Sequence, residues 1–456
     1  MIDLIIVASY LIFLLIIGLS QRSATSGFKG FATINDSSTQ KNKLILVATI
    51  FASSIGGGTA FGLSEKAFAS NVAYSYGLFL AIPTDILIAM YIVPKLTMKH
   101  YGAETVGDIM FSYYGVVGRT IGGLAALLVS IGFLAAQVSV SGRIFEYILQ
   151  VNYVEGVVIS YGIILIYTTI GGLRSVLFTN LIQFFAILVA IPIISVFGLY
   201  KIGLSEFVHS LPDEKIAIWN NLPLVKTTIS AFLGFAVMNL FPTFIQRALI
   251  NKDSKNTSKA IYIKSFIYAI FLILITINGL IAFIIYPESK SSLALPYLID
   301  HIIPIGFQGL VVTGLLAAVM STADSDLNIT SATLVKDFLK PIFNLSDQKK
   351  MLILARVTNV LIGSLAIYFS LMFSSVVDLV IFIAGFWAPI ILVPLVFGLY
   401  DITISKAGMV TCAFVGSLSF IIWECSAKSD SDLKGVFIGT LVSLLAFIVF
   451  RIGQRR

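Results

Sequence analysis

The chain has 456 residues, of which 58% are apolar and 12% are charged, and its formal net charge is +7. Soluble proteins carry about 25% charged residues, so this composition excludes an ordinary soluble protein. Apolar runs of about 18 residues or more recur along the whole chain, which predicts an all-α, polytopic membrane protein embedded in a lipid bilayer.

We count about thirteen transmembrane helices, and they belong to a single transmembrane domain that spans residues 1–456. An extra helix over 2–20 comes first, followed by five helices over 43–200, five more over 227–400 and two C-terminal helices over 406–451. The first run lacks a basic N-terminal region and is long enough to cross the bilayer. We therefore interpret it as a retained helix and not as a signal peptide.

Most of the 30 lysines and arginines fall in alternate connections between the predicted helices. The positive-inside rule then predicts an N-terminus outside the cell membrane and a cytoplasmic C-terminus. Because topology explains the excess of basic residues, no nucleic-acid partner is required. The sequence makes no prediction about the oligomeric state.

The second predicted helix contains three consecutive glycines, Gly56, Gly57 and Gly58, followed by Thr59. Glycine costs about 1 kcal/mol per helix-interior position relative to alanine, so three together favour an unwound segment within the membrane. A solute could contact these four residues directly. The alternative interpretation is close packing of helices at small residues.

A second interruption is predicted in the seventh helix, where Gly234, Asn239 and Pro242 occur in one apolar run. Proline removes one backbone donor from the helix, and Asn239 is a further candidate for solute contact. Interrupted helices at matching positions in two halves indicate a transporter built from two inverted five-helix repeats.

The ninth predicted helix contains Ala318, Ser321 and Thr322, which fall on one helical face. Hydroxyls beside a freed carbonyl offer hard oxygen ligands, which suit a small cation such as sodium. The alternative is that both hydroxyls simply bond back to the preceding turn of their own helix.

Three polar or aromatic residues in other helices are further candidates for solute contact: Asp85, Gln137 and Trp387. A charge at the depth of Asp85 costs at least about 2.5 kcal/mol, so we expect it to face the bundle interior. Asp85 could equally be a structural hydrogen-bond partner, and Trp387 could merely pack.

Several of these segments resemble the sodium:solute symporter family, and the resemblance covers nearly the whole chain. The segments that carry it are Ala317 to Thr322, Tyr167 to Val176, Thr179 to Gln183, Ala52 to Gly58, and Gln246 with Arg247. The resemblance implies a ten-helix inverted-repeat core. It also implies a sodium site made of the carbonyls of Ala52, Ile55 and Ala318 and the hydroxyls of Ser321 and Thr322.

The resemblance also points to a possible second ion site. Many family members have an acidic residue where this chain has Asn180, and some use it to bind a second sodium ion. Asp324 and Ser325 stand at the other positions associated with that site, so we expect Asp324 to supply the missing carboxylate from the facing helix.

We therefore expect a sodium-coupled symporter that imports a small organic solute by alternating access, with no enzymatic activity and no cofactor other than sodium as coupling ion. Amino acids, quaternary amines and organic acids all remain candidate solutes. A proton-coupled carrier, and a non-coupled channel or sensor on the same fold, are the alternative functions.

Overall fold

The computed structural model describes residues 2–34, 42–219, 221–236, 240–370, 382–383, 385–426 and 435–454. Every regular element within these residues is a helix. Their order is α1 (Ile2–Ser20), η1 (Gln21–Ala24), α2 (Phe28–Ala32), α4 (Lys43–Ala52), η2 (Gly58–Gly62), α5 (Leu63–Ala69), α6 (Ala73–Leu87), η3 (Ile88–Ile92), α7 (Val93–His100), α8 (Val106–Tyr147), α9 (Tyr153–Ile202), α10 (Leu204–His209), α11 (Asp213–Ile216), α12 (Leu222–Ala236), α13 (Pro242–Ala248), α14 (Ser254–Ile285), η4 (Ser291–Leu293), α15 (Ala294–Ile302), α16 (Phe307–Thr333), η5 (Leu334–Leu339), α17 (Lys340–Ile342), α18 (Gln348–Ser370), η6 (Ala388–Leu392), α20 (Val393–Leu399), α21 (Lys406–Ser426) and α22 (Gly435–Gly453).

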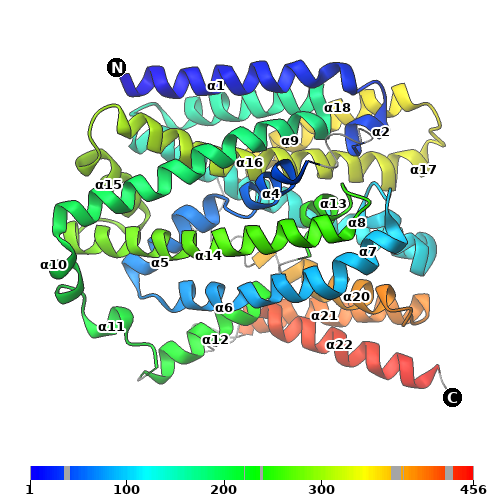
Figure 1. Cartoon of the computed structure of the whole chain (residues 1–456). Coiled ribbons are helices and arrows are strands. Elements are labelled where there is room, and N and C mark those ends of the chain that lie inside the picture. The colour runs from blue at the N-terminus through cyan, green and yellow to red at the C-terminus, as the bar shows by residue number, and fades with distance from the viewer. Residues whose placement is uncertain are drawn as a thin grey trace.

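Nine helical segments in the described part of the chain are long and apolar enough to cross a membrane, and three shorter apolar helices accompany them. The long helices lie side by side with roughly parallel axes, as Figure 1 shows. This arrangement confirms the predicted all-α membrane fold. The total of thirteen crossings stays a prediction.

One long element, α9, contains the two predicted helices 154–171 and 176–200 and changes direction at Gly172. There φ is 58° and ψ is −154°, a backbone conformation that glycine adopts readily. A Cβ at this position would lie 2.8 Å from the Cα of Phe31, so the close approach of α2 also requires glycine.

The α16 helix lies at the centre of the bundle and packs mainly against α9 and α8. All its residues from Val311 to Thr333 are buried, although the helix carries several hydroxyls and two carboxylates. Polar groups buried in this way need partners on neighbouring helices, because each unpaired group in an apolar surrounding costs several kcal/mol.

The extra N-terminal helix α1 also packs on α9 and α16. The carboxylate of Asp3 accepts hydrogen bonds from the backbone N–H groups of Gly306 (2.8 Å) and Gly309 (2.6 Å) at the start of α16. An acidic side chain at a helix N-terminus satisfies free donors and complements the helix dipole. The contact ties α1 to the central helix.

The first predicted helix interruption is present in the structure, and the second is present in part, since Gly234 stays within the α12 helix. The second predicted helix stops at Ala52, where α4 ends, and resumes at Gly58 as η2. The second interruption lies between α12 and α13, and Pro242 stands in the first turn of α13, where its missing N–H has no cost. Asn239 lies outside the described residues.

Candidate functional site

The end of α4 meets the middle of α16 through a hydrogen bond between distant parts of the chain. The hydroxyl of Ser321 donates to the carbonyl oxygen of Ala52 at 2.9 Å, and it also lies 3.0 Å from the carbonyl oxygen of Ala318. The Thr322 hydroxyl lies 3.3 Å from that same Ala318 oxygen. Four of the predicted sodium ligands are therefore joined by direct contacts.

The α4 helix ends at Ala52 partly because its next side chains compete with the backbone. The hydroxyls of Ser53 and Ser54 donate to the carbonyls of Thr49 (2.6 Å) and Ile50 (2.7 Å), one turn earlier. Local bonds of this type weaken helix continuation. Ile55, the fifth predicted ligand, is fully buried within the same break.

A side chain from α8 supports the unwound segment. The Gln137 Oε1 atom accepts the backbone N–H of Gly57 at 2.8 Å, which replaces a helical hydrogen bond lost at the break. Gln137 is itself buried. The residue predicted to contact solute therefore also holds the glycine segment in its unwound form.

Gly56 permits the close approach of three helices. A Cβ on Gly56 would lie 2.9 Å from Oγ1 of Thr322 and 3.0 Å from Nε2 of Gln137. Either contact would displace a polar side chain, since real Cβ atoms rarely come so close. The missing side chain thus lets α16 and α8 approach the break from two sides.

The oxygens at this junction suit an alkali-metal ion. Backbone carbonyls and hydroxyls are hard, neutral ligands, and they are buried between helices where water is scarce. Four of the five predicted ligands are fully buried, and Thr322 is 8% exposed. Thr322 also lines a neighbouring cavity, so the junction has an access route from that side.

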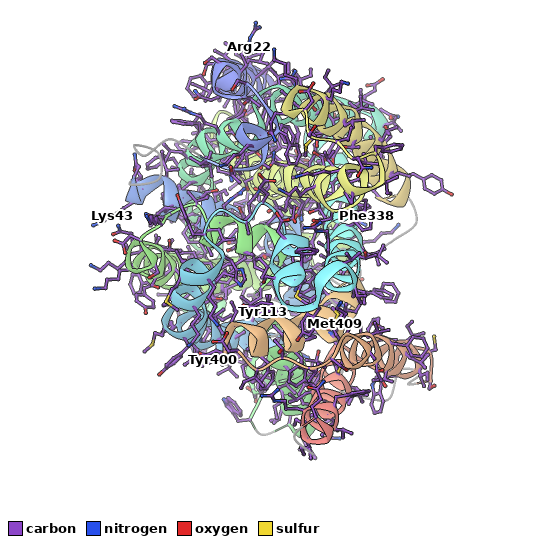
Figure 2. The ribbon with its side chains drawn as sticks, turned by 90° about the vertical axis from the view of Figure 1, so that its right-hand side faces the viewer. Arg22, Lys43, Tyr113, Phe338, Tyr400 and Met409 are labelled. Atoms are coloured by element: carbon purple, nitrogen blue, oxygen red, sulfur yellow. The ribbon has the colours of Figure 1, made fainter. Side chains whose placement is uncertain are left out.

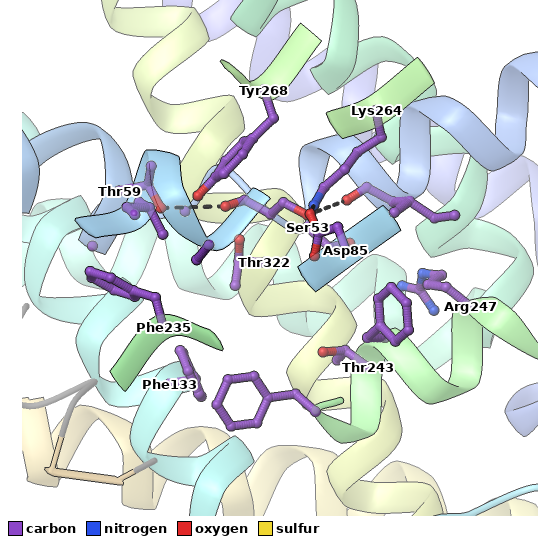
Figure 3. A pocket seen from close by; sticks show the side chains of 18 of the residues that line it. Ser53, Thr59, Asp85, Phe133, Phe235, Thr243, Arg247, Lys264, Tyr268 and Thr322 are labelled. Carbon is purple, nitrogen blue, oxygen red and sulfur yellow. Dashed lines mark hydrogen bonds and ion pairs between the residues drawn. The ribbon is translucent and has the colours of Figure 1, made fainter. Parts of the chain in front are cut away.

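This cavity has a volume of about 190 Å³ and opens between α4, α6, α8, α13, α14 and α16. Among the predicted solute contacts, it is lined by Gly56, Gly58, Thr59, Asp85 and Gln137. Figure 3 shows Lys264 and Tyr268 on one wall, with Phe133 and Phe235 on the opposite wall. The cavity therefore combines a charged and polar wall with an aromatic one.

Of the predicted solute contacts that the structure describes, two do not line the cavity. Trp387 is fully buried, and its ring centre lies 6.1 Å from that of Phe241, which does line the cavity. Gly57 uses its backbone N–H to hold Gln137. The structure thus brings most of the predicted residues together around the cavity, whereas Trp387 lies behind Phe241.

Asp85 forms a buried ion pair that the sequence analysis missed. Its Oδ2 atom lies 2.6 Å from Nζ of Lys264 on α14, and the two side chains are each 6% exposed. The hydroxyl of Ser265 donates to the same oxygen at 3.3 Å. Lys264 also lies over the ring of Tyr268, 4.8 Å from its centre.

A signal for Lys264 was present in the sequence. The residue lies just inside the predicted helix 262–286, where an ionisable side chain indicates a buried partner or a site. Its position near the helix end favours the alternative that the side chain extends toward the interface. The tertiary contact with Asp85 excludes that alternative.

The residues of the possible second ion site also lie together, deeper along α16. Asp324 Oδ2 accepts hydrogen bonds from the hydroxyls of Tyr167 (2.7 Å) and Thr179 (3.2 Å) on α9. The amide of Asn180 lies 3.5 Å from Oγ of Ser325. Sequence reasoning identified the carboxylate but not its tyrosine partner.

The chain has clear relatives among known transporters. Residues 42–416 match the model of the sodium:solute symporter family. The sodium/pantothenate symporter of Escherichia coli (strain K12) is 24% identical over 418 residues, which cover 86% of this chain and 86% of that protein. The high-affinity proline transporter PutP of Bacillus subtilis (strain 168) is 26% identical over 385 residues, covering 78% and 79% respectively.

A solved structure shares the whole fold. The substrate-bound, outward-open state of a Na⁺-coupled sialic acid symporter aligns with a TM-score of 0.84 and 18% sequence identity. The alignment covers 100% of this chain and 97% of that chain. At this identity the likeness establishes the arrangement of helices, and it agrees with the predicted fold class.

Proposed function

Since the chain belongs to the sodium:solute symporter family, we propose that its broken helix and α16 form the site through which sodium drives solute uptake. The chain is a multi-pass membrane transporter and not an enzyme, and sodium is its coupling ion. Its cargo is a small-molecule solute. Uptake then proceeds by alternating access around a central site.

The proposed sodium ligands are the carbonyl oxygens of Ala52, Ile55 and Ala318 and the hydroxyls of Ser321 and Thr322. The observation that carries this proposal is the 2.9 Å contact between Ser321 and Ala52. It brings an unwound helix end and a hydroxyl-bearing helix within coordination reach. A bound sodium ion would take both oxygens as neutral ligands, with the Ser321 hydroxyl keeping its proton and directing it away from Ala52, and would hold α4 against α16.

The solute cavity lies beside this site, and the two share Thr322. Sodium binding therefore orders the same broken segment that forms one wall of the cavity. One sodium ion supplies enough energy for useful uptake. A tenfold gradient gives about 1.4 kcal/mol, and a potential of about 100 mV adds roughly 2.3 kcal/mol per charge.

The charges on the cavity wall favour a solute that carries a carboxylate. Lys264 on this wall pairs with Asp85, whereas every guanidinium nitrogen of Arg247 is engaged elsewhere, so Lys264 is the basic group that can meet the solute. Lys264 has further donor protons beyond the one directed at Asp85. An amino acid or organic acid fits this wall better than a quaternary amine.

We also propose that Asp324 and Ser325 on α16 and Asn180 on α9 form a second cation-binding position between these two helices. Their contacts support it, since a buried carboxylate needs a positive partner. This position lies about one helical turn further along α16 than Ser321. The two proposed sites are linked, because the Ser325 hydroxyl donates to the Ser321 carbonyl at 2.8 Å.

The proposed orientation has the N-terminus outside and the C-terminus in the cytoplasm. It is supported by the two chain ends, which lie at opposite ends of the helix bundle in Figure 1. Arg22 and Lys43 lie at the end that faces the viewer in Figure 2, which is also the end of the C-terminus. Basic residues concentrate on the cytoplasmic side of membrane proteins.

Thermal stability of the purified full-length chain tests the proposed coupling. Amino acids, organic acids and quaternary amines are each added in sodium chloride and in potassium chloride at fixed pH. We expect a carboxylate-bearing solute to raise the melting temperature only with sodium. Equal stabilisation in potassium would contradict the site, and stabilisation that instead depends on pH would favour a proton-coupled carrier.

A further inference from the structure

A single arginine side chain occupies the space between the broken helix and the deeper part of α16. Arg247, on α13, is 1% exposed. Its Nε donates to Oγ1 of Thr49 at 2.9 Å and its Nη1 to Oε1 of Gln246 at 2.8 Å. Its Nη2 donates to Oγ of Ser325 at 2.6 Å. Each guanidinium nitrogen therefore has a defined partner.

The Ser325 hydroxyl lies between this cation and a buried carboxylate, and its single proton is shared between Oδ1 of Asp324 and the carbonyl oxygen of Ser321 (2.8 Å). Its oxygen lies 2.6 Å from Nη2 of Arg247 and 3.2 Å from Oδ1 of Asp324. Within the described part of the chain, the other oxygen of Asp324 accepts hydrogen bonds from two neutral hydroxyls, those of Tyr167 and Thr179. Arg247 is thus the cation that the contacts connect to Asp324.

We infer that the guanidinium of Arg247 is itself the cation of the second position, so that the protein binds one sodium ion and not two. This inference rests on the proposed function, since it assigns the occupant of the Asp324, Ser325 and Asn180 position. A guanidinium keeps its charge inside a protein and holds its donors in a fixed plane.

Two oxygens around the second position, those of Ser325 and Thr49, are already engaged, whereas Oδ1 of Asn180 is buried and has no hydrogen-bond partner among the described residues. The Ser325 oxygen accepts from Arg247, and Thr49 Oγ1 accepts from both Arg247 and the Asn180 amide, the latter at 3.0 Å. A sodium ion at this position could not use these oxygen lone pairs as ligands. It would also lie beside a fixed positive charge. Coulomb repulsion at such a short distance in a weakly screened interior is large.

The same contacts explain why the primary site stays available. The contacts of Arg247 go to Ser325, Thr49 and Gln246, and not to the carbonyls of Ala52 or Ala318. The Ser321 and Thr322 hydroxyls remain directed at those carbonyls. The primary site therefore binds a sodium ion from solution, whereas the second position is occupied by the guanidinium of Arg247.

Equilibrium binding of radiolabelled sodium to the purified full-length chain tests the inference without knowledge of the solute. At alkaline pH, where protonation of a carboxyl is disfavoured, we expect one sodium per wild-type chain and a Hill coefficient of one. Arg247→Gln leaves Asp324 without its positive partner and should bind two sodium ions. The double variant Arg247→Gln with Asp324→Asn should return to one.

Arg356→Gln is the matched control. Arg356 donates to the backbone carbonyls of Thr169 (3.0 Å) and Ile170 (3.3 Å), and these contacts involve no carboxylate. The same substitution there should leave the count at one. A count of two in Arg356→Gln would mean that loss of any such arginine creates a site, which would contradict the inference.

The outcomes separate this inference from the proposed function. Two sodium ions in the wild-type chain, or one in folded Arg247→Gln, would overturn the role of Arg247 and leave the primary site intact. No sodium in the wild-type chain would overturn both. The wild-type count needs no variant, so the test remains decisive even if Arg247→Gln fails to fold.

Discussion

The hydroxyl oxygen of Ser321 lies 2.9 Å from the carbonyl oxygen of Ala52, although the two residues are 269 positions apart in the chain. Ala52 is the last residue of α4 before the break, and Ser321 is in the middle of the buried α16. The contact therefore joins an unwound helix to an intact one. Sodium binding between these two oxygens would therefore depend directly on the distance between α4 and α16.

Removal of either proposed hydroxyl ligand should weaken sodium binding. For Ser321→Ala and for Thr322→Ala we expect at least a tenfold lower sodium affinity, equivalent to about 1.4 kcal/mol, because alanine offers no oxygen to the ion. Sodium titration of the purified variants measures the change. Protein abundance in the membrane should stay near the wild-type amount.

Ser331→Ala is the control for these variants. Ser331 is buried on the same helix, and its hydroxyl has no hydrogen-bond partner among the described residues. Its loss should leave sodium affinity unchanged. An affinity equal to wild type in both Ser321→Ala and Thr322→Ala would exclude the proposed ligands.

Addition of one methyl group at Gly56 should disturb both the sodium site and the cavity. In Gly56→Ala the new Cβ would stand 2.9 Å from Oγ1 of Thr322 and 3.0 Å from Nε2 of Gln137. Thr322 then moves away from Ala318, so we expect sodium affinity to fall about tenfold or more. Gly162→Ala, which places its Cβ in open space, should behave as wild type.

The Asp85–Lys264 pair should show strong coupling in a double-mutant cycle. Loss of one partner from a buried ion pair costs about 3–5 kcal/mol, because the other charge stays buried and unpaired. Asp85→Asn and Lys264→Met should therefore each lower the melting temperature. The double variant should recover most of that loss, whereas additive losses would show that the pair is not coupled.

The same variants distinguish a structural pair from one that also binds solute. If Lys264 contacts a carboxylate on the solute, the double variant regains stability but not solute affinity. Solute-dependent stabilisation of the double variant, measured in sodium, provides the comparison. Wild-type solute affinity in that variant would assign the pair a purely structural role.

Trp387 should influence the cavity only through its neighbour. Because its ring packs against Phe241 and does not line the cavity, Trp387→Ala should lower stability by about 3–5 kcal/mol, as expected for a large buried aromatic residue. Trp387→Phe should retain solute affinity within about threefold. A loss of affinity in Trp387→Phe with unchanged stability would instead indicate direct contact with solute.

Local sequence was sufficient to predict the all-α membrane fold and the helix interruptions next to Ala52 and Pro242. A bilayer requires long apolar runs, and three consecutive glycines or a proline act on the backbone wherever they stand. The break after Ala52 and the start of α13 at Pro242 were therefore predictable. The hydroxyls of Ser321 and Thr322 were predictable as a pair, because helical periodicity places them on one face with Ala318.

Only the tertiary structure decided which buried charges meet. Lys264 pairs with Asp85 across 179 residues of sequence, and Arg247 reaches Ser325 across 78. No local pattern encodes such contacts, because they depend on how helices that are distant in the sequence pack against one another. Apolar runs thus determined that this chain crosses the membrane, and glycine and proline determined where its helices break, whereas packing decided that Lys264 lies beside Asp85 and Arg247 beside Ser325, since such contacts depend on distance in space and not along the chain.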